Sequence, residues 1–268
     1  VLLFKDIATT PIRDAFDPKF VIFCMVGTTI MFMGIWALTS IFMKDKSMVG
    51  AFTQASARGS AAVLGIAFVQ NIYGNSGMTP LMIVSAVPLY NIYSVIILTF
   101  CANNQDHSDK AATIKRAFKN ILTNPIILGI AAGVPFSLLN IELPPLVLKT
   151  VTNVAQTATP MALLAVGAGF EGRKAIKKLK PTMIATFIKL VALPAIYFPF
   201  AIAMGFRESA LVAILIMVGS PTTVTCYIMA KNMGNDGVLS SSIIVMATLL
   251  SSVTLTFWIF LLKSMGLI

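Results

Sequence analysis

Long uncharged apolar runs recur along this chain of 268 residues, and they constrain its fold more than any other feature. A helix needs about 20 mostly apolar residues to cross the hydrocarbon core of a bilayer. Residues Phe20 to Met43 and Val238 to Leu262 form uncharged runs of that length. Apolar residues make up 57% of the chain and charged residues 11%, a balance foreign to ordinary soluble domains. The sequence therefore predicts an all-α polytopic membrane protein in a lipid bilayer.

Eight full spans are expected, together with a partial one at the start of the chain. The full spans are predicted at residues 20–43, 48–73, 78–102, 120–139, 146–170, 182–204, 210–233 and 238–262.

Two of these spans contain interruptions that a smooth membrane helix does not need. The first half of the span at 48–73 carries a run of polar and small residues: Gln54, Ser56, Arg58, Gly59 and Ser60. Glycine permits a break, and hydroxyls can replace missing backbone partners. A central arginine costs about 2.5 to 3.5 kcal/mol on insertion scales, so a chain that keeps one usually uses it. The span at 210–233 has a second interruption, Gly219-Ser220-Pro221-Thr222-Thr223.

The two interrupted spans belong to an internal repeat. The turns GNSG (residues 74–77) and GNDG (residues 234–237) are 160 positions apart, and at this offset Gly59-Ser60 aligns with Gly219-Ser220. The second interrupted span is the fifth span after the first, and because this number is odd, the two copies run in opposite directions through the membrane. The sequence predicts two inverted five-helix repeats with broken crossover helices, the first at residues 1–110 and the second at 111–268.

The repeat implies a longer complete protein. Because the second copy has five spans and the first only three and a fragment, we expect about 45 further residues, or one and a half spans, before Val1. The complete fold would have ten spans.

Basic residues predict the orientation of the chain. One side collects twelve of them: Lys44, Lys46, Lys110, Lys115, Arg116, Lys119, Arg173, Lys174, Lys177, Lys178, Lys180 and Lys231. The other side has five: Lys5, Arg13, Lys19, Arg207 and Lys263. The positive-inside rule makes the first side cytoplasmic and leaves the C-terminus outside, as in a multi-pass protein of the cell membrane.

The sequence lacks the residue patterns that are typical of nucleic-acid-binding proteins, metalloproteins and enzymes. The net charge of +10 comes mainly from short loops between spans, which argues against nucleic-acid binding. The three cysteines have no metal-ligand spacing, and no His/Cys/Asp/Glu cluster or phosphate-binding glycine loop is present. We therefore expect no metal, no cofactor and no enzymatic activity.

Two stretches carry a resemblance to a known family. FTQASARGSAAVLGIAFVQNIYG and GSPTTVTCYIMAKNMGNDGVLSSSIIV resemble the auxin efflux carrier family, in its bacterial branch of malate and malonate permeases. The resemblance covers the whole chain. It implies ten helices in inverted repeats, a substrate site where the broken fourth and ninth helices cross, transport of organic anions, and often a homodimer. Ser60 stands where plant members have asparagine, and Ala67 where they have the crossover proline.

The expected substrate site lies at the two interruptions. A guanidinium pairs well with a carboxylate, so Arg58 is the first candidate to bind the anion. The alternatives are that Arg58 reaches back to the membrane surface or caps carbonyls of the break. The other candidates are Gln54, Ser56, Gly59, Ser60, Ser220, Pro221, Thr222, Thr223, Thr225, Asn71 and Tyr227. Lys189, deep in its span, could be a second charge or could reach back to the surface.

The sequence thus favours a secondary transporter of small organic anions, such as dicarboxylates or auxin-like carboxylates, working by alternating access. All ten acidic residues lie in loops or at span ends, which favours uniport. A sodium-coupled organic-anion symporter of the bile-acid transporter type is the alternative. A membrane enzyme or receptor would need an intramembrane catalytic pair, and the sequence shows none.

Overall fold

A computed structural model describes residues 1–9, 16–102, 110–139 and 141–268, and its described elements are all helices. Arg13, counted above among the basic residues, lies outside these ranges. The helices are α1 (Leu2–Ala8), α2 (Pro18–Phe42), α3 (Val49–Ala57), α4 (Ala61–Tyr73), α5 (Thr79–Phe100), α6 (Lys110–Thr123), α7 (Pro125–Leu138), α8 (Pro145–Ala168), α9 (Gly172–Lys177), α10 (Leu179–Phe187), α11 (Leu193–Ala203), α12 (Ser209–Gly219), α13 (Thr225–Asn232) and α14 (Gly237–Ser264).

Within the described ranges, four helices are long and apolar enough to cross a membrane: α2, α5, α14 and the continuous helix that α10 and α11 form through a π-helical turn. The two interrupted spans fall outside this group because each is divided in two. Their halves have 9 and 13 residues in α3 and α4, and 11 and 8 in α12 and α13. No half reaches the length that a bilayer requires.

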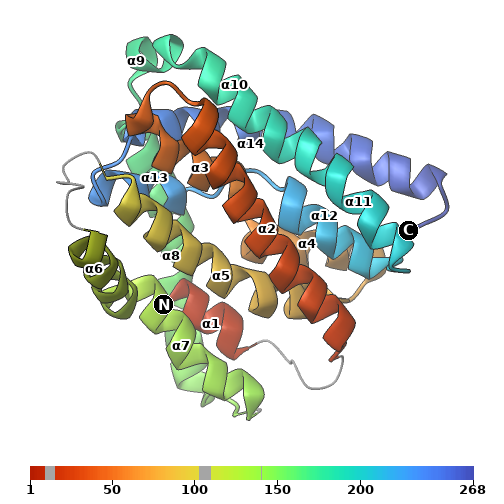
Figure 1. The fold of residues 1–268 in the computed structure, drawn as a ribbon. Helices are drawn as coiled ribbons and strands as arrows, with labels where there is room; N and C mark the ends of the chain where they lie inside the picture. Colours follow the sequence, from red (N-terminus) through yellow and green to blue (C-terminus); the bar gives the residue numbers. More distant parts are fainter. Residues whose placement is uncertain (10–15, 103–109, 140) are drawn as a thin grey trace.

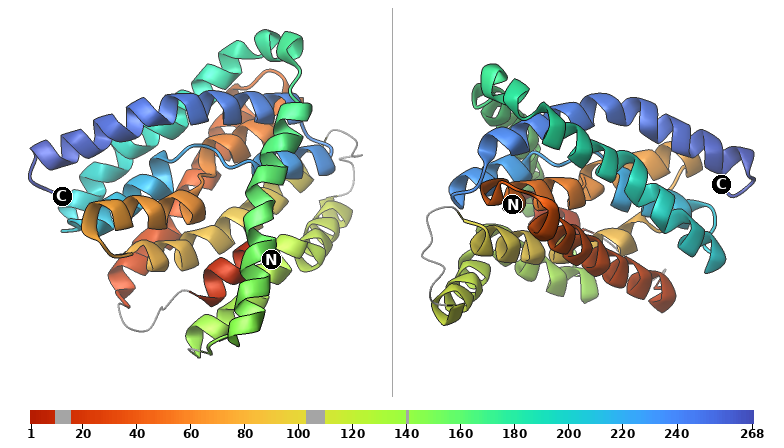
Figure 2. Two further views of the ribbon diagram at one scale, coloured as in Figure 1. Left: turned by 180° about the vertical axis from the view of Figure 1, so that it is seen from behind. Right: turned by 45° about the horizontal axis from the view of Figure 1, so that its top comes forward.

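The helices form two groups that meet along one side (Figures 1 and 2). The smaller group contains α1, α7 and α8, with α1 packed against both of the others, and α6 lies beside it. The larger group contains α2 to α5 and α10 to α14, including both broken spans. α5 contacts α6 and α7, and α13 contacts α8, so these contacts join the two groups.

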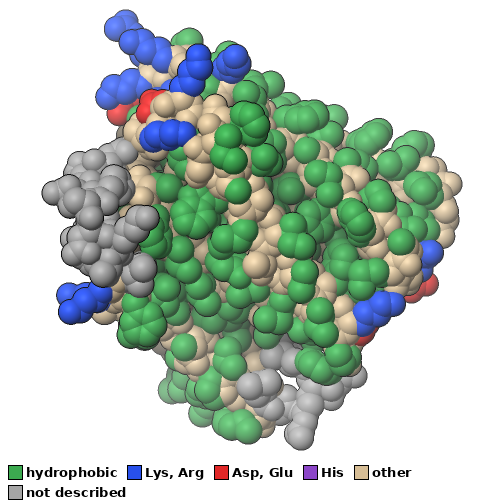
Figure 3. Space-filling model, in the orientation of Figure 1, with side chains coloured by type: hydrophobic (Ala, Val, Ile, Leu, Met, Phe, Trp, Pro, Cys, Tyr) green, Lys and Arg blue, Asp and Glu red, His purple; other side chains and the backbone are tan. Residues whose placement is uncertain are grey.

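The surface matches a protein immersed in lipid. Figure 3 shows one face covered largely by hydrophobic side chains, with Lys and Arg gathered toward its margins. Large apolar side chains point outward, among them Phe42 at 76% exposure and Leu146 at 77%. Water would penalise such exposure, whereas hydrocarbon does not.

Local sequence signals fix the helix ends. Asp17 and Asp236 accept hydrogen bonds from first-turn N–H groups of α2 and α14, as N-cap aspartates do. The two similar turns each start at a glycine in the left-handed region, Gly74 at φ 74° and Gly234 at φ 69°. Glycine adopts this conformation without steric cost, so both turns can reverse the chain directly after a helix.

Candidate functional site

Both interrupted spans are broken in mid-course, where the sequence predicts interruptions. α3 ends at Ala57 and α4 begins at Ala61, while α12 ends at Gly219 and α13 begins at Thr225. Each break leaves carbonyl groups without helical partners at the end of one half and N–H groups without them at the start of the next.

The two breaks lie against each other and exchange hydrogen bonds. Gly59 and Thr222 form an isolated antiparallel bridge, and the Ser60 N–H donates to the Pro221 carbonyl oxygen at 2.9 Å. The Thr222 hydroxyl donates to the carbonyl oxygen of Ala55, in the last turn of α3, at 2.7 Å. Each break therefore supplies hydrogen-bond partners for some of the backbone N–H and C=O groups that the other leaves unpaired.

The crossing is so close that it needs glycine at position 59. A Cβ atom placed there would collide with the hydroxyl of Ser220 and lie 3.0 Å from the Nζ of Lys189. Gly59 thus allows the second break and a buried ammonium to approach the first break directly.

A cavity of about 550 Å³ borders the crossing, a volume typical of small-molecule sites. It lies between the two helix groups, because residues of α1, α7 and α8 line one part and residues of both broken spans line another. Its hydroxyl groups come from Ser60, Thr159, Thr222, Thr223, Thr225 and Thr248. Within the described parts of the chain, no charged side chain lines this cavity.

Two helix N-termini open onto this cavity. Ser60 and Leu64 line it from the start of α4, and Thr225 and Ile228 line it from the start of α13. Neither N-terminus has a side-chain cap hydrogen bond. A helix N-terminus carries a partial charge of about +0.5, and its free N–H groups bind anions. The two N-termini therefore place partial positive charge beside the cavity, although in α13 the N–H groups of Cys226 and Tyr227 already donate to the carbonyl oxygens of Thr223 and Val224.

Arg58 lies in the first break but outside the cavity wall. Its side chain is buried, and its Nη2 donates to Asn91 Oδ1 at 2.8 Å while its Nη1 lies 3.1 Å from the Met229 sulfur. No described carboxylate pairs with it. The guanidinium therefore does not reach back to the membrane surface, and its direct partners are α5 and α13.

The remaining predicted residues fall into three groups. Ser60, Pro221, Thr222, Thr223 and Thr225 line the cavity, and Gly59 and Ser220 lie in the crossing beside it.

Gln54 and Ser56 are buried in the last part of α3 and do not line the cavity. Asn71 is exposed on α4 and donates to the Ala67 carbonyl oxygen of its own helix at 2.7 Å. Tyr227 is buried, and its hydroxyl oxygen lies 3.2 Å from Lys231 Nζ. These four residues therefore do not line the cavity.

Some residues at the site were not among the sequence candidates. Thr159 and Thr248 add hydroxyls from α8 and α14, and Asn91 holds Arg58 from α5. Thr159 precedes a proline within its span, and Thr248 belongs to a serine- and threonine-rich span. Both patterns occur at many other positions in the chain. Only the packed structure shows that Thr159 and Thr248 line the cavity and that Asn91 contacts Arg58.

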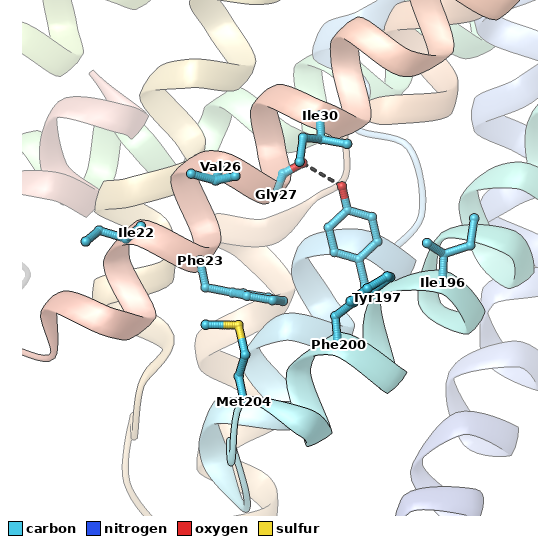
Figure 4. Close-up of a pocket in the computed structure, with 9 residues that line it drawn as sticks. All are labelled: Ile22, Phe23, Val26, Gly27, Ile30, Ile196, Tyr197, Phe200 and Met204. Atoms are coloured by element: carbon cyan, nitrogen blue, oxygen red, sulfur yellow. Dashed lines mark hydrogen bonds between the residues drawn. The ribbon is translucent and has the colours of Figure 1, made fainter.

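A second cavity, of about 400 Å³, lies on the outer side of α2 and α11 (Figure 4). Its walls are apolar side chains such as Phe23, Ile196 and Met204. Among the described residues that line it, Tyr197 carries the one polar side-chain group, and its hydroxyl already donates to the Gly27 carbonyl oxygen at 2.6 Å. This groove suits hydrocarbon and offers no group that would hold an anion.

Comparisons with known proteins agree with a transport role. The profile of a family described as "Membrane transport protein" matches residues 1–259. The "Putative malonate transporter" of Rhizobium meliloti (strain 1021) is 24% identical over 271 aligned positions, covering 98% of this chain and 83% of that protein. The chain therefore belongs to the membrane transport protein family, the auxin efflux carrier family that its sequence resembles.

Proposed function

We propose that this chain is a secondary transporter that carries small organic anions across the membrane by alternating access. The anion would lie in the cavity beside the crossing, with its carboxylate against the starts of α4 and α13. One observation carries this proposal: two helix N-termini without side-chain caps meet at one cavity between two helix groups. N–H groups at the start of α4, together with the partial positive charge of both N-termini, can replace the water that a carboxylate loses.

Buried positive charge supports the choice of an anion. Within the described residues, Arg58 and Lys189 are buried cations without a carboxylate partner. Two such charges near the crossing would be costly unless negative charge compensates them at some stage of the cycle. A bound carboxylate would supply that compensation, with Arg58 acting from behind the wall of the cavity.

The helix grouping suggests how the carrier moves. The group of α1, α7 and α8 would stay fixed while the group that holds both broken spans moves against it, exposing the cavity to each side in turn. The two groups would combine parts of two inverted repeats, residues 1–110 and 111–268. Basic loops would face the cytoplasm, and the protein would assemble as a homodimer in the cell membrane.

Dicarboxylates are the substrate class we propose first. The relative from Rhizobium meliloti bears the name of a malonate transporter, and malonate is a small dianion that a cavity of about 550 Å³ can hold. Hydroxyls around the cavity would hydrogen-bond the second carboxylate. We propose no covalent step and no cofactor.

Uptake into liposomes tests this proposal. Purified protein would be reconstituted and offered labelled malonate, malate, succinate or indole-acetate, with and without sodium and proton gradients. We expect saturable uptake of at least one dicarboxylate above protein-free liposomes. Uptake of none of these anions, by protein that remains folded and correctly inserted, would contradict the proposal.

A further inference from the structure

The C-terminal ends of α3 and α12 converge on one buried side chain, that of Lys189. Its Nζ donates to the Ala57 carbonyl oxygen at 2.9 Å and to the Met217 carbonyl oxygen at 3.3 Å. Ala57 is the last residue of α3, and Met217 lies in the last turn of α12. One ammonium group thus bridges the negative ends of two half-helix dipoles.

A local irregularity of the helix places Lys189 at this position. It lies in the π-helical turn Ile188–Ala192, in which the Leu193 N–H bonds the Ile188 carbonyl. Pro194 cannot donate a hydrogen bond to the Leu190 carbonyl, and the indole N–H of Trp258 donates to that oxygen instead, at 2.9 Å. π-turns are frequent at functional sites.

Burying the Lys189 ammonium costs free energy that a purely structural side chain would not require. Lys189 has no exposed surface, and no described carboxylate forms an ion pair with it. The effective penalty for burying an ion is several kcal/mol, and hydrogen bonds to carbonyl groups must offset it. An apolar side chain of similar length would fill the volume without that penalty. Packing therefore does not account for a positive charge at this position.

The surroundings of Lys189 Nζ are those of a cation site. Ends of half-helices and unwound carbonyls coordinate sodium ions or protons in many secondary transporters. Here Tyr90 donates its hydroxyl to the same Met217 carbonyl oxygen at 2.9 Å, and Ser220 places a buried hydroxyl with no hydrogen-bond partner on the same face of Gly59 as the Lys189 ammonium.

We propose that Lys189 is a tethered cation, occupying the position at which a soluble coupling cation would otherwise bind, so that the carrier moves its anion with no sodium ion at the crossing. This inference deepens the proposed function and rests on it for its transport consequence. It also discriminates between uniport and the sodium-coupled alternative, because one site cannot hold both the ammonium and a sodium ion.

Removal of the ammonium should turn this position into a site for a small soluble cation. Thermal unfolding of purified Lys189→Ala would be compared in sodium, methylammonium and choline chloride at equal ionic strength. We expect sodium or methylammonium to raise the Tm of Lys189→Ala relative to choline. The wild type and Lys149→Ala, which removes an exposed span lysine, should have the same Tm in all three salts. Equal Tm values for folded Lys189→Ala in all three salts would overturn the proposal.

Transport supplies a second test, and its first part uses the wild type alone, so it does not depend on the folding of a variant. Wild-type uptake of malonate should be the same when choline replaces sodium on both sides of the liposome, and a requirement for sodium would overturn the tethered cation while leaving the transporter intact. In choline, Lys189→Ala should take up malonate about tenfold more slowly than the wild type, because the position is then empty of positive charge. Methylammonium should restore part of that uptake. If the wild type carries no anion in any medium, the proposed function fails, and the salt dependence of Tm still decides the cation site.

Discussion

The backbone N–H of Ser60 donates to the carbonyl oxygen of Pro221 at 2.9 Å, and this bond joins two breaks that lie far apart in the sequence. Gly59 and Thr222 pair beside it. An unwound segment inside a membrane must satisfy its polar backbone within the protein, because lipid offers no partner. These two breaks satisfy part of that requirement for each other, which ties the geometry of one half-site to that of the other.

Gly59→Ala should destabilise the protein and reduce transport. The new methyl group would meet Ser220 and Lys189, and overpacking of this kind costs about 1–3 kcal/mol. Thermal unfolding in detergent would measure the loss. Gly34→Ala is the matched control, since a Cβ atom at Gly34 would meet no atom within 4 Å. Equal Tm values for the two variants would show that the crossing has room for a methyl group at position 59.

Thr222→Val tests the bond between the two broken spans. The substitution keeps the shape of the side chain but removes the hydroxyl that donates to the Ala55 carbonyl oxygen at 2.7 Å. An unsatisfied buried acceptor costs about 1–3 kcal/mol, so we expect a lower Tm and slower uptake. Thr150→Val should leave both unchanged, because the Thr150 hydroxyl is exposed and bonds only its own helix. A Thr222→Val protein with wild-type Tm would argue against the bond.

Arg58→Ala should abolish anion uptake while the protein still folds. The substitution removes a buried positive charge close to the starts of α4 and α13, and with it the bond to Asn91. Arg58→Lys keeps the charge without the planar guanidinium geometry, so it should retain more uptake than Arg58→Ala. Circular dichroism and uptake in liposomes would be measured together. Wild-type uptake by Arg58→Ala would remove Arg58 from the site.

Asp45 gives the loop before α3 a dependence on pH. Its carboxylate accepts hydrogen bonds from the Ser47 hydroxyl at 2.6 Å and the Ser47 N–H at 3.0 Å, and these bonds lower the pKa of Asp45. Because the pKa of Asp45 is lower in the folded state than in the unfolded state, its ionised carboxylate stabilises the fold. This stabilisation is fully present above the unfolded pKa of about 3.9 and is lost as the pH falls through the folded pKa.

Amide exchange of Ser47 would report this effect. Its protection, corrected for the intrinsic pH dependence of exchange, should decrease below about pH 4 in the wild type, because the protonated carboxyl is the weaker acceptor. In Asp45→Asn the corrected protection should not change over that range, since the amide does not titrate. A wild-type profile as flat as that of Asp45→Asn would contradict the assignment.

The breaks themselves are readable from sequence, because glycine, proline and small hydroxyls in mid-span have few other uses there. The polar run that ends at Ser60 and the run that begins at Gly219 both lie at the observed breaks. That the two breaks meet is also expected, once the shared offset is noticed.

Side-chain direction is the part that sequence did not reveal. The sequence predicts that Arg58 binds the anion, but it does not predict that the guanidinium contacts Asn91 from behind the cavity wall, because the backbone at the break decides where the side chain points. Asn71 and Tyr227 belong to the same motifs yet do not line the cavity. The burial of Lys189 depends on a π-turn for which the sequence offers only a nearby proline.

Protection of a cysteine in the cavity tests the central claim most directly, namely that the anion lies where α4 and α13 begin. Thr223→Cys would be made in a background lacking Cys24, Cys101 and Cys226, and labelled with a charged thiol reagent at increasing malonate concentrations. The account predicts that labelling slows and saturates over the same concentration range as uptake. Labelling at an unchanged rate, under malonate concentrations that saturate uptake by the same variant, would contradict it.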